Sequence, residues 1–149
     1  MEQQWDKLLK IKTSGRDDTK SDCFRYPYEP TPYAVLERLA NSGFIRKQDV
    51  VLDYGCGKGR VDFFLTYQTR AHCIGVEYDE RIIAVARENQ NTAVSAGRVE
   101  ILLGNAETFP VPQNINRIFF FNPFSVEILQ KAMARILESY YETSRELLL

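Results

Sequence analysis

The sequence of 149 residues has little of what defines several classes of protein. It contains three cysteines, Cys23, Cys56 and Cys73, and one histidine, His72. This odd, scattered set of cysteines favours reduced thiols over a disulfide framework, and its spacing matches no zinc site. We therefore predict no metal centre and a chain kept in a reducing compartment.

Long apolar runs and an excess of one charge are also missing. The longest apolar stretches, such as residues 117–121, fall far short of the ~20 residues that a spanning helix needs. The amino terminus shows no secretory signal. Nineteen basic and twenty acidic residues give a net charge of −1, so no overall positive field attracts nucleic acid or an anionic membrane. We expect a cytoplasmic protein without a membrane partner.

What is present suits one compact domain, with 44% hydrophobic and 26% charged residues. Residues 1–25 are predicted to be a weakly structured N-terminal extension with one or two helical turns, and residues 26–149 to be the domain itself. Thr31 is expected to cap a helix that has Pro32 in its first position. That helix is expected to end at Gly43.

Apolar runs and helical periodicity then alternate along the chain. Strands are predicted over 50–54, 72–77, 99–103 and 117–121, with helices between them and a strongly amphipathic helix after the last. Asp79 is expected to cap one of these helices. The alternation predicts an α/β fold, a doubly wound and mainly parallel sheet, in which ligands sit beyond the carboxyl ends of the strands.

The first predicted strand runs into a glycine-rich loop, VLDYGCGKGR. Its three glycines, Gly55, Gly57 and Gly59, permit positive φ angles and close approach of a ligand to the backbone. A dinucleotide-binding loop would need glycine at the position of Arg60, so a typical NAD loop is disfavoured. Asp53 is placed to accept hydrogen bonds from an ammonium group or from loop amides. A plain turn between strand and helix is the alternative.

The next two strand ends also carry polar residues. Glu77 ends the second strand, where a carboxylate can accept both hydroxyls of a ribose. The third strand leads into Asn105 and Ala106, where a side-chain amide and a backbone N–H can contact the edge of an adenine ring. An exposed acid and an asparagine turn are the respective alternatives. Together, the glycine loop and Glu77 indicate a nucleoside cofactor.

The fourth strand ends in the sequence Asn122-Pro123-Phe124. Asn-Pro can simply stop a strand, and Phe124 can belong to the core. Its position opposite the glycine loop, however, is where a substrate would meet the cofactor. There the Asn122 amide and nearby carbonyl groups would hold an amine, and Phe124 would supply an apolar wall.

These motifs resemble those of the seven-strand, Rossmann-like (class I) S-adenosylmethionine-dependent methyltransferases. VLDYGCGKGR is similar to their glycine motif, GVEYDE to their ribose-binding acid, GNAETF to their adenine-edge motif and FFFNPF to their fourth-strand substrate motif. The resemblance covers residues from about 26 to the end of the chain. It implies S-adenosyl-L-methionine as cofactor, with Asn122, Pro123 and Phe124 as catalytic residues.

Two branches of the family compete. Enzymes with an Asn-Pro-Pro-Tyr/Phe motif methylate amides or base amines, but this sequence lacks the second proline. The seven-strand protein lysine methyltransferases carry a Tyr-x-x-Thr element, which Tyr28-Glu29-Pro30-Thr31 resembles. That resemblance implies that Tyr28 and Thr31 line the methionine end of the cofactor. An amine nitrogen is the favoured acceptor, with protein lysine slightly ahead of a nucleic-acid base or a small molecule.

The family pattern implies three further strands, so we expect a fold shortened after the fourth strand and its helix. The fourth strand would then be an exposed sheet edge, and Leu148 would extend the apolar face of the last helix. We expect either that another chain covers this surface, as in a homodimer formed through that edge and helix, or that the sequence is a shortened version of a longer protein. A non-catalytic S-adenosylmethionine-binding or association module is the second hypothesis, because the substrate pocket is the part most affected by such shortening. A nucleotide-dependent oxidoreductase is the third and is disfavoured by Arg60.

Overall fold

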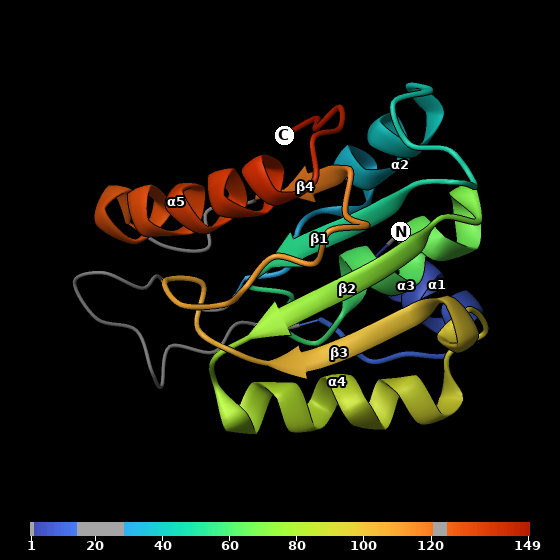
Figure 1. Ribbon diagram of the computed structural model, residues 1–149. Helices are drawn as coiled ribbons and strands as arrows, with labels where there is room; N and C mark the ends of the chain where they lie inside the picture. The colour runs from blue at the N-terminus through green and yellow to red at the C-terminus, as the bar shows by residue number, and fades with distance from the viewer. Residues whose placement is uncertain (1, 15–28, 121–124) are drawn as a thin grey trace.

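A parallel sheet between layers of helix forms the protein, and the computed structural model describes residues 2–14, 29–120 and 125–149. Helices cover both faces of the sheet (Figure 1). The predicted α/β, doubly wound fold is therefore confirmed. In the described residues the sheet contains four strands in the order β3-β2-β1-β4, all of them parallel: β1 (Val50–Tyr54), β2 (His72–Glu77), β3 (Val99–Leu103) and β4 (Arg117–Phe119).

The described helices divide between the two faces of the sheet. Because successive side chains of a strand point to opposite faces, Val51 packs into the core beneath α1 to α4, and Leu52 into the core beneath α5. A short 3-10 turn precedes β3. The helix bounds are α1 (Glu2–Leu9), α2 (Tyr33–Asn41), α3 (Arg60–Thr69), α4 (Glu80–Thr92) and α5 (Val126–Glu142).

The order of the strands creates a topological switch point between β1 and β4. The chain proceeds from β1 to β2 and β3 on one side, then returns to place β4 on the other side of β1. Connections that leave in opposite directions open a crevice at the carboxyl ends of these two strands. The glycine loop and Asp53 lie at that end of β1.

Residues 2–14 contain the short helix that was predicted, but they pack more firmly than a weakly structured extension would. Residues Glu2–Leu9 form a helix, and Leu9 and Ile11 are buried in the core shared with α3. Thr31 does not cap α2, because Pro32 occupies the cap position and no side chain caps the helix. Gly43 follows the helix with a φ of +83°, so the predicted left-handed stop is confirmed.

The fourth strand is shorter than predicted and is not a bare edge. It ends at Phe119, so Phe120 follows it, and Phe121 lies outside the described residues. The Ile118 N–H donates to the Leu148 carbonyl at 2.9 Å, and the Leu148 N–H donates to the Asn116 carbonyl at 3.1 Å. The prediction of an edge with unpaired backbone is therefore wrong at these residues, because the chain turns back after α5 and lies parallel to β4.

The last helix is amphipathic, as predicted, and buries only part of its apolar face. α5 ends at Glu142, so Leu148 is not part of it. Its buried positions are Ile128, Ala132, Ile136 and Ser139. Leu137 and Tyr140 are apolar but are 47% and 37% exposed, because the buried stripe is narrower than the apolar face of this amphipathic helix. Among the described residues, no helix is long and apolar enough to cross a membrane.

Candidate functional site

The glycine loop between β1 and α3 has the backbone that its sequence predicts. Gly55, Gly57 and Gly59 have φ angles of +70°, +57° and +94°. The N–H groups of Gly55 and Cys56 both donate to the Val76 carbonyl, at 2.8 and 3.0 Å, and so attach the loop to β2. A Cβ on Gly59 would lie 2.6 Å from the Phe63 ring, so glycine is also required there for packing.

Glu77 at the end of β2 connects the loop to the start of α4. Its Oε1 accepts the Gly57 N–H at 3.0 Å, and its Oε2 accepts the Asp79 N–H at 3.0 Å. The side chain is buried, and burial raises the pKa of Glu77, although these backbone hydrogen bonds act to lower it. A carboxylate has about four acceptor positions, so each oxygen retains capacity for a ligand hydroxyl.

Two further carboxyl groups, those of Asp53 and Asp62, are buried beneath the loop. Among the described residues, no backbone N–H and no side chain that always carries a proton donates a hydrogen bond to Asp53 Oδ2 or to either side-chain oxygen of Asp62. Burial raises the pKa of Asp53 well above its usual range, and the charges of Asp62 and Glu77 add to this. Burial also raises the pKa of Asp62 to about 7, although a hydrogen bond with Asp53 lowers it. Both shifts favour the protonated, uncharged form of these carboxyl groups.

Three amides of the glycine loop, those of Gly55, Cys56 and Gly57, do not donate to the Asp53 side chain. The N–H groups of Gly55 and Cys56 donate to Val76 instead, and that of Gly57 donates to Glu77. Asp53 is left beside a small pocket that it lines together with Gly55 and Thr31. A buried acceptor at a pocket is suited to a cationic ligand group.

At the end of β3, Asn105 forms the turn that was the alternative interpretation. Its side-chain oxygen accepts the Glu107 N–H at 3.0 Å, and the Gly104 N–H donates to the Glu77 carbonyl at 2.9 Å. Ala106 packs against the core beneath α5. Asn105 and Ala106 therefore directly follow Gly104, the residue that is hydrogen-bonded to Glu77 at the end of β2.

Several predicted residues therefore meet at one edge of the sheet. Thr31, Asp53 and Gly55 line one pocket, and Gly57 is bonded to Glu77. His72 lies at the opposite end of β2 and is exposed. Tyr28, Asn122, Pro123 and Phe124 lie outside the described residues.

Arg60 and Asp62 were not recognised as site residues from the sequence. Arg60 was considered only as the residue that replaces a third glycine, yet its side chain lines the pocket and is 3% exposed. Asp62 stands between apolar residues, Val61 and Phe63, near the start of α3 and is fully buried. Neither position carries a local signal, because a charged residue at the start of a helix is ordinarily solvated.

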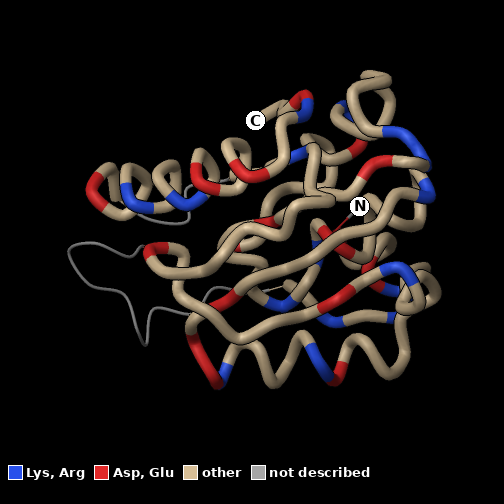
Figure 2. Tube along the Cα trace, viewed as in Figure 1, with Lys and Arg blue, Asp and Glu red and all other residues tan. Residues whose placement is uncertain are grey.

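The charged groups of the described surface are mixed in sign. Figure 2 shows Lys and Arg interspersed with Asp and Glu along α4 and α5. Lys131 and Glu107 form an ion pair at 3.8 Å, and Arg135 pairs with Glu138 at 2.7 Å. Within the described ranges, no group of three or more His, Cys, Asp or Glu side chains is arranged to hold a metal ion.

The family follows from a match over most of the chain. Residues 45–147 match the family model described as a methyltransferase domain. The chain belongs to this methyltransferase-domain family. The matched residues contain the four strands, the glycine loop and Glu77, whereas α1 and α2 precede them.

One curated relative and two solved structures show what the chain is similar to. A protein-lysine N-methyltransferase from Saccharolobus islandicus (strain REY15A) is 32% identical over 80 residues, which are 53% of this chain and 50% of that protein. The match thus spans about half the length of that relative. An RNA methyltransferase from Salinibacter ruber, in complex with S-adenosyl-L-homocysteine, has a TM-score of 0.63 at 24% identity, over 74% of this chain and 71% of that chain.

A second solved structure has the same ligand. It is an S-adenosylmethionine-dependent methyltransferase from Thiobacillus denitrificans, in complex with S-adenosyl-L-homocysteine, with a TM-score of 0.54 at 18% identity, over 60% of this chain and 36% of that chain. At these identities the two structures show a shared fold. The Rossmann-like methyltransferase fold predicted from the sequence is thereby confirmed.

Proposed function

We propose that the protein is an S-adenosylmethionine-dependent methyltransferase that transfers a methyl group to an amine nitrogen. The observation that carries this proposal is the hydrogen bond between the Glu77 carboxylate and the Gly57 N–H, which joins the glycine loop to the end of β2 beside the switch point. An adenosyl ligand needs this combination of a Cβ-free loop and a carboxylate for its ribose.

The described side chains fit the ligand's amino-acid end. S-Adenosylmethionine carries an ammonium group. Asp53 lines the pocket, and its buried Oδ2 accepts no hydrogen bond from a backbone N–H or from a permanently protonated side chain among the described residues. An adjacent cation would stabilise the charged form of this carboxyl group. We assign Asp53, Thr31 and the loop glycines to this end, Glu77 to the ribose hydroxyls, and Asn105 and Ala106 to the adenine edge. Tyr28 is assigned by motif alone.

The chemistry asks little of the protein beyond alignment. Bound S-adenosylmethionine supplies a methyl group on a positively charged sulfur, which is a good leaving group. The chain's own residues have to orient the acceptor nitrogen and exclude water. A lysine acceptor must first lose a proton from a pKa of about 10.4, and an apolar wall at Phe121 and Phe124 would favour this by desolvation. Asn122 would hold the amine.

Protein lysine is the favoured acceptor for two reasons. The Tyr-x-x-Thr element at residues 28–31 resembles that of protein lysine methyltransferases, and the 32% identical relative is named a protein-lysine N-methyltransferase. A nucleic-acid base, a small amine and a cofactor-binding module without activity are the alternatives. Basic and acidic residues are interspersed along α4 and α5 in Figure 2, and this mixed pattern does not favour a nucleic acid as the methyl acceptor.

Calorimetry and a transfer assay test the proposal in two stages. Titration with S-adenosylhomocysteine should show saturable binding, and titration with NAD should show none. The protein is then incubated with methyl-labelled S-adenosylmethionine and, in separate reactions, with lysate protein, lysate RNA and small amines. Label on lysine side chains, located by mass spectrometry, supports the proposal. Binding without label in any fraction would instead support a non-catalytic module.

A further inference from the structure

The Arg60 side chain connects two segments of the chain, residues 2–14 and the residues just before α2, to the end of the glycine loop. It is the first residue of α3, and its side chain is 3% exposed. Its Nε donates to Thr13 Oγ1 at 2.7 Å, and its Nη1 donates to the Thr31 carbonyl at 3.1 Å. The same Nη1 forms an ion pair with the Glu2 carboxylate. The planar, five-donor guanidinium group is suited to holding several acceptors in a fixed geometry.

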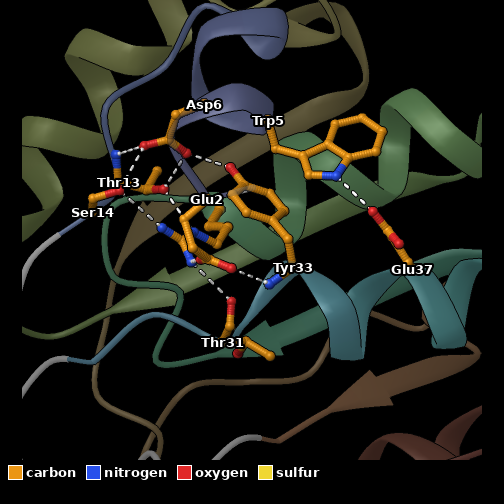
Figure 3. Close-up of polar contacts among 9 residues, drawn as sticks. Glu2, Trp5, Asp6, Thr13, Ser14, Thr31, Tyr33 and Glu37 are labelled. Atoms are coloured by element: carbon orange, nitrogen blue, oxygen red, sulfur yellow. Dashed lines mark hydrogen bonds and ion pairs between the residues drawn. The ribbon is translucent and has the colours of Figure 1, made fainter.

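The N-terminal clasp, defined as residues 2–14, is held together around the same group. Figure 3 shows Asp6, Thr13 and Tyr33 pointing toward one another. Asp6 Oδ2 accepts the Thr13 N–H at 2.8 Å, and Asp6 Oδ1 accepts the Tyr33 hydroxyl. The Arg60 guanidinium lies 4.3 Å from the centroid of the Tyr33 ring, within the range of a cation–π contact.

A second contact joins the clasp to the glycine loop. The Asn89 side-chain amide on α4 donates to the Lys12 carbonyl at 3.1 Å and to the Lys58 carbonyl at 2.9 Å. Its oxygen accepts the Lys12 N–H at 2.9 Å. Asn89 is buried, so these bonds are protected from water. The clasp thus contacts the loop through Lys58 as well as through Arg60.

The contacts of Arg60 reach the candidate ligand pocket. The pocket is lined by residues 29–31, Arg60 and Val61, together with residues 53–56 and Phe119. The carbonyl that Arg60 holds belongs to Thr31, one of these lining residues. Glu2 Oε1 also accepts the Tyr33 N–H at 3.1 Å, which fixes the start of α2 just after Thr31. The position of the pocket wall therefore depends on the docking of the clasp.

We propose that Arg60 is a positioning residue through which the N-terminal clasp holds Thr31 at the ligand pocket, so that clasp docking and adenosyl-ligand binding favour one another. This inference rests on the proposed function for the identity of the ligand. Coupling of this kind is reciprocal: if docking raises ligand affinity, the ligand must stabilise the docked clasp by the same factor. The clasp precedes residues 45–147, which match the methyltransferase-domain family.

Trp5 provides a direct readout of clasp docking. It is the single tryptophan of the chain. Its indole Nε1 donates to Glu37 at 2.7 Å, and its ring packs edge-on against Phe64 with centroids 4.9 Å apart. Undocking would expose this ring to water. Acrylamide quenching of its fluorescence therefore measures the docked fraction, with and without S-adenosylhomocysteine.

The test compares the full-length wild type with Glu2→Gln and Arg60→Lys, using S-adenosylhomocysteine as the ligand. We expect both variants to bind it about 5- to 150-fold more weakly, the usual range for coupled sites. Both should show stronger Trp5 quenching without ligand, and saturating ligand should reduce that quenching. Arg60→Lys keeps the positive charge but loses the planar guanidinium with its several donors, so it should retain more affinity for S-adenosylhomocysteine than Arg60→Ala.

The matched control is Glu146→Gln, which removes the same negative charge as Glu2→Gln but at an exposed site after α5. It should change neither the affinity for S-adenosylhomocysteine nor the quenching of Trp5. If the wild type binds S-adenosylhomocysteine and the two clasp variants bind it equally well, the inference is overturned and the proposed function stands. Weaker binding with no ligand effect on Trp5 quenching also overturns it, because the residues would then act on stability alone. A wild type that binds no S-adenosylhomocysteine overturns both proposals.

Discussion

The carboxylate of Glu77 accepts the backbone N–H of Gly57 at 3.0 Å, across 20 residues of sequence. This bond joins the two motifs that the sequence singled out, the glycine loop and the acid that ends β2. It means that Glu77 has two tasks: it fixes the loop, and it offers its remaining acceptor positions to a ligand.

Replacing Glu77 by alanine should weaken binding of S-adenosylhomocysteine about 10- to 100-fold, since hydrogen bonds to a charged group contribute about 1.5–3 kcal/mol. Glu77→Gln keeps the shape and one acceptor oxygen, so we expect an intermediate loss. Calorimetric titration measures both. Glu100→Ala, at an exposed position on the neighbouring strand β3, is the control and should bind as the wild type does. Unchanged affinity in Glu77→Ala would refute the ribose assignment.

The buried carboxyl of Asp62 should make stability fall with rising pH. Its pKa is about 7 in the folded protein, against 3.8 for an unperturbed group, so the unfolded chain loses this proton first. The free energy of unfolding therefore decreases between about pH 4 and pH 7 and levels off above that, with each unit of raised pKa worth about 1.4 kcal/mol.

Asp62→Asn should make this decrease shallower, although Asp53 will retain part of it because its pKa is raised as well. Urea unfolding at a series of pH values measures the slope. Glu100→Gln, which is exposed on β3, should reproduce the wild-type slope. If the free energy of unfolding changed with pH in the same way in the wild type and in Asp62→Asn, ionisation of Asp62 would carry no cost to stability and the prediction would be wrong.

Two glycines with positive φ should respond differently to alanine. Gly43 has no atom within 4 Å of an added Cβ, so Gly43→Ala should cost only the left-handed conformation, about 1–2 kcal/mol. A Cβ on Gly59 would lie 2.6 Å from the Phe63 ring, which adds overpacking of about 1–3 kcal/mol. Thermal unfolding should therefore show a clearly larger loss of Tm for Gly59→Ala. Equal losses would mean that the Phe63 ring moves aside freely.

Self-association is expected through α5. Val126, Leu137 and Tyr141 on this helix are 65%, 47% and 79% exposed. Light scattering after gel filtration should give a dimer for the wild type and a monomer for the double variant Leu137→Glu/Tyr141→Glu. Phe44→Glu, at a 59% exposed apolar position away from α5, should remain dimeric. A stable wild-type monomer would contradict this expectation.

Much of the fold was predictable because its signals are local. A short apolar run that ends at glycines predicted β1, and a second run at residues 72–77 predicted β2. The Asp79 side chain caps α4 as its sequence position suggests, accepting the Arg81 N–H at 2.9 Å. The interpretation of Thr31 as a cap was wrong, because Pro32 takes the cap position and the Thr31 carbonyl accepts a hydrogen bond from Arg60 instead. A partner 29 residues away leaves no trace in a local pattern.

The sequence by itself determined the kinds of element, their order and the placing of the glycine loop and Glu77 at strand ends, since periodicity and backbone freedom are properties of neighbouring residues. Only the tertiary structure decided that Leu148 pairs with β4, that Asp53 and Asp62 share a buried site and that Arg60 joins the N-terminal residues to the pocket. Burial and hydrogen-bond partners depend on which distant segments come together, and desolvation then sets the charge state of the groups enclosed there.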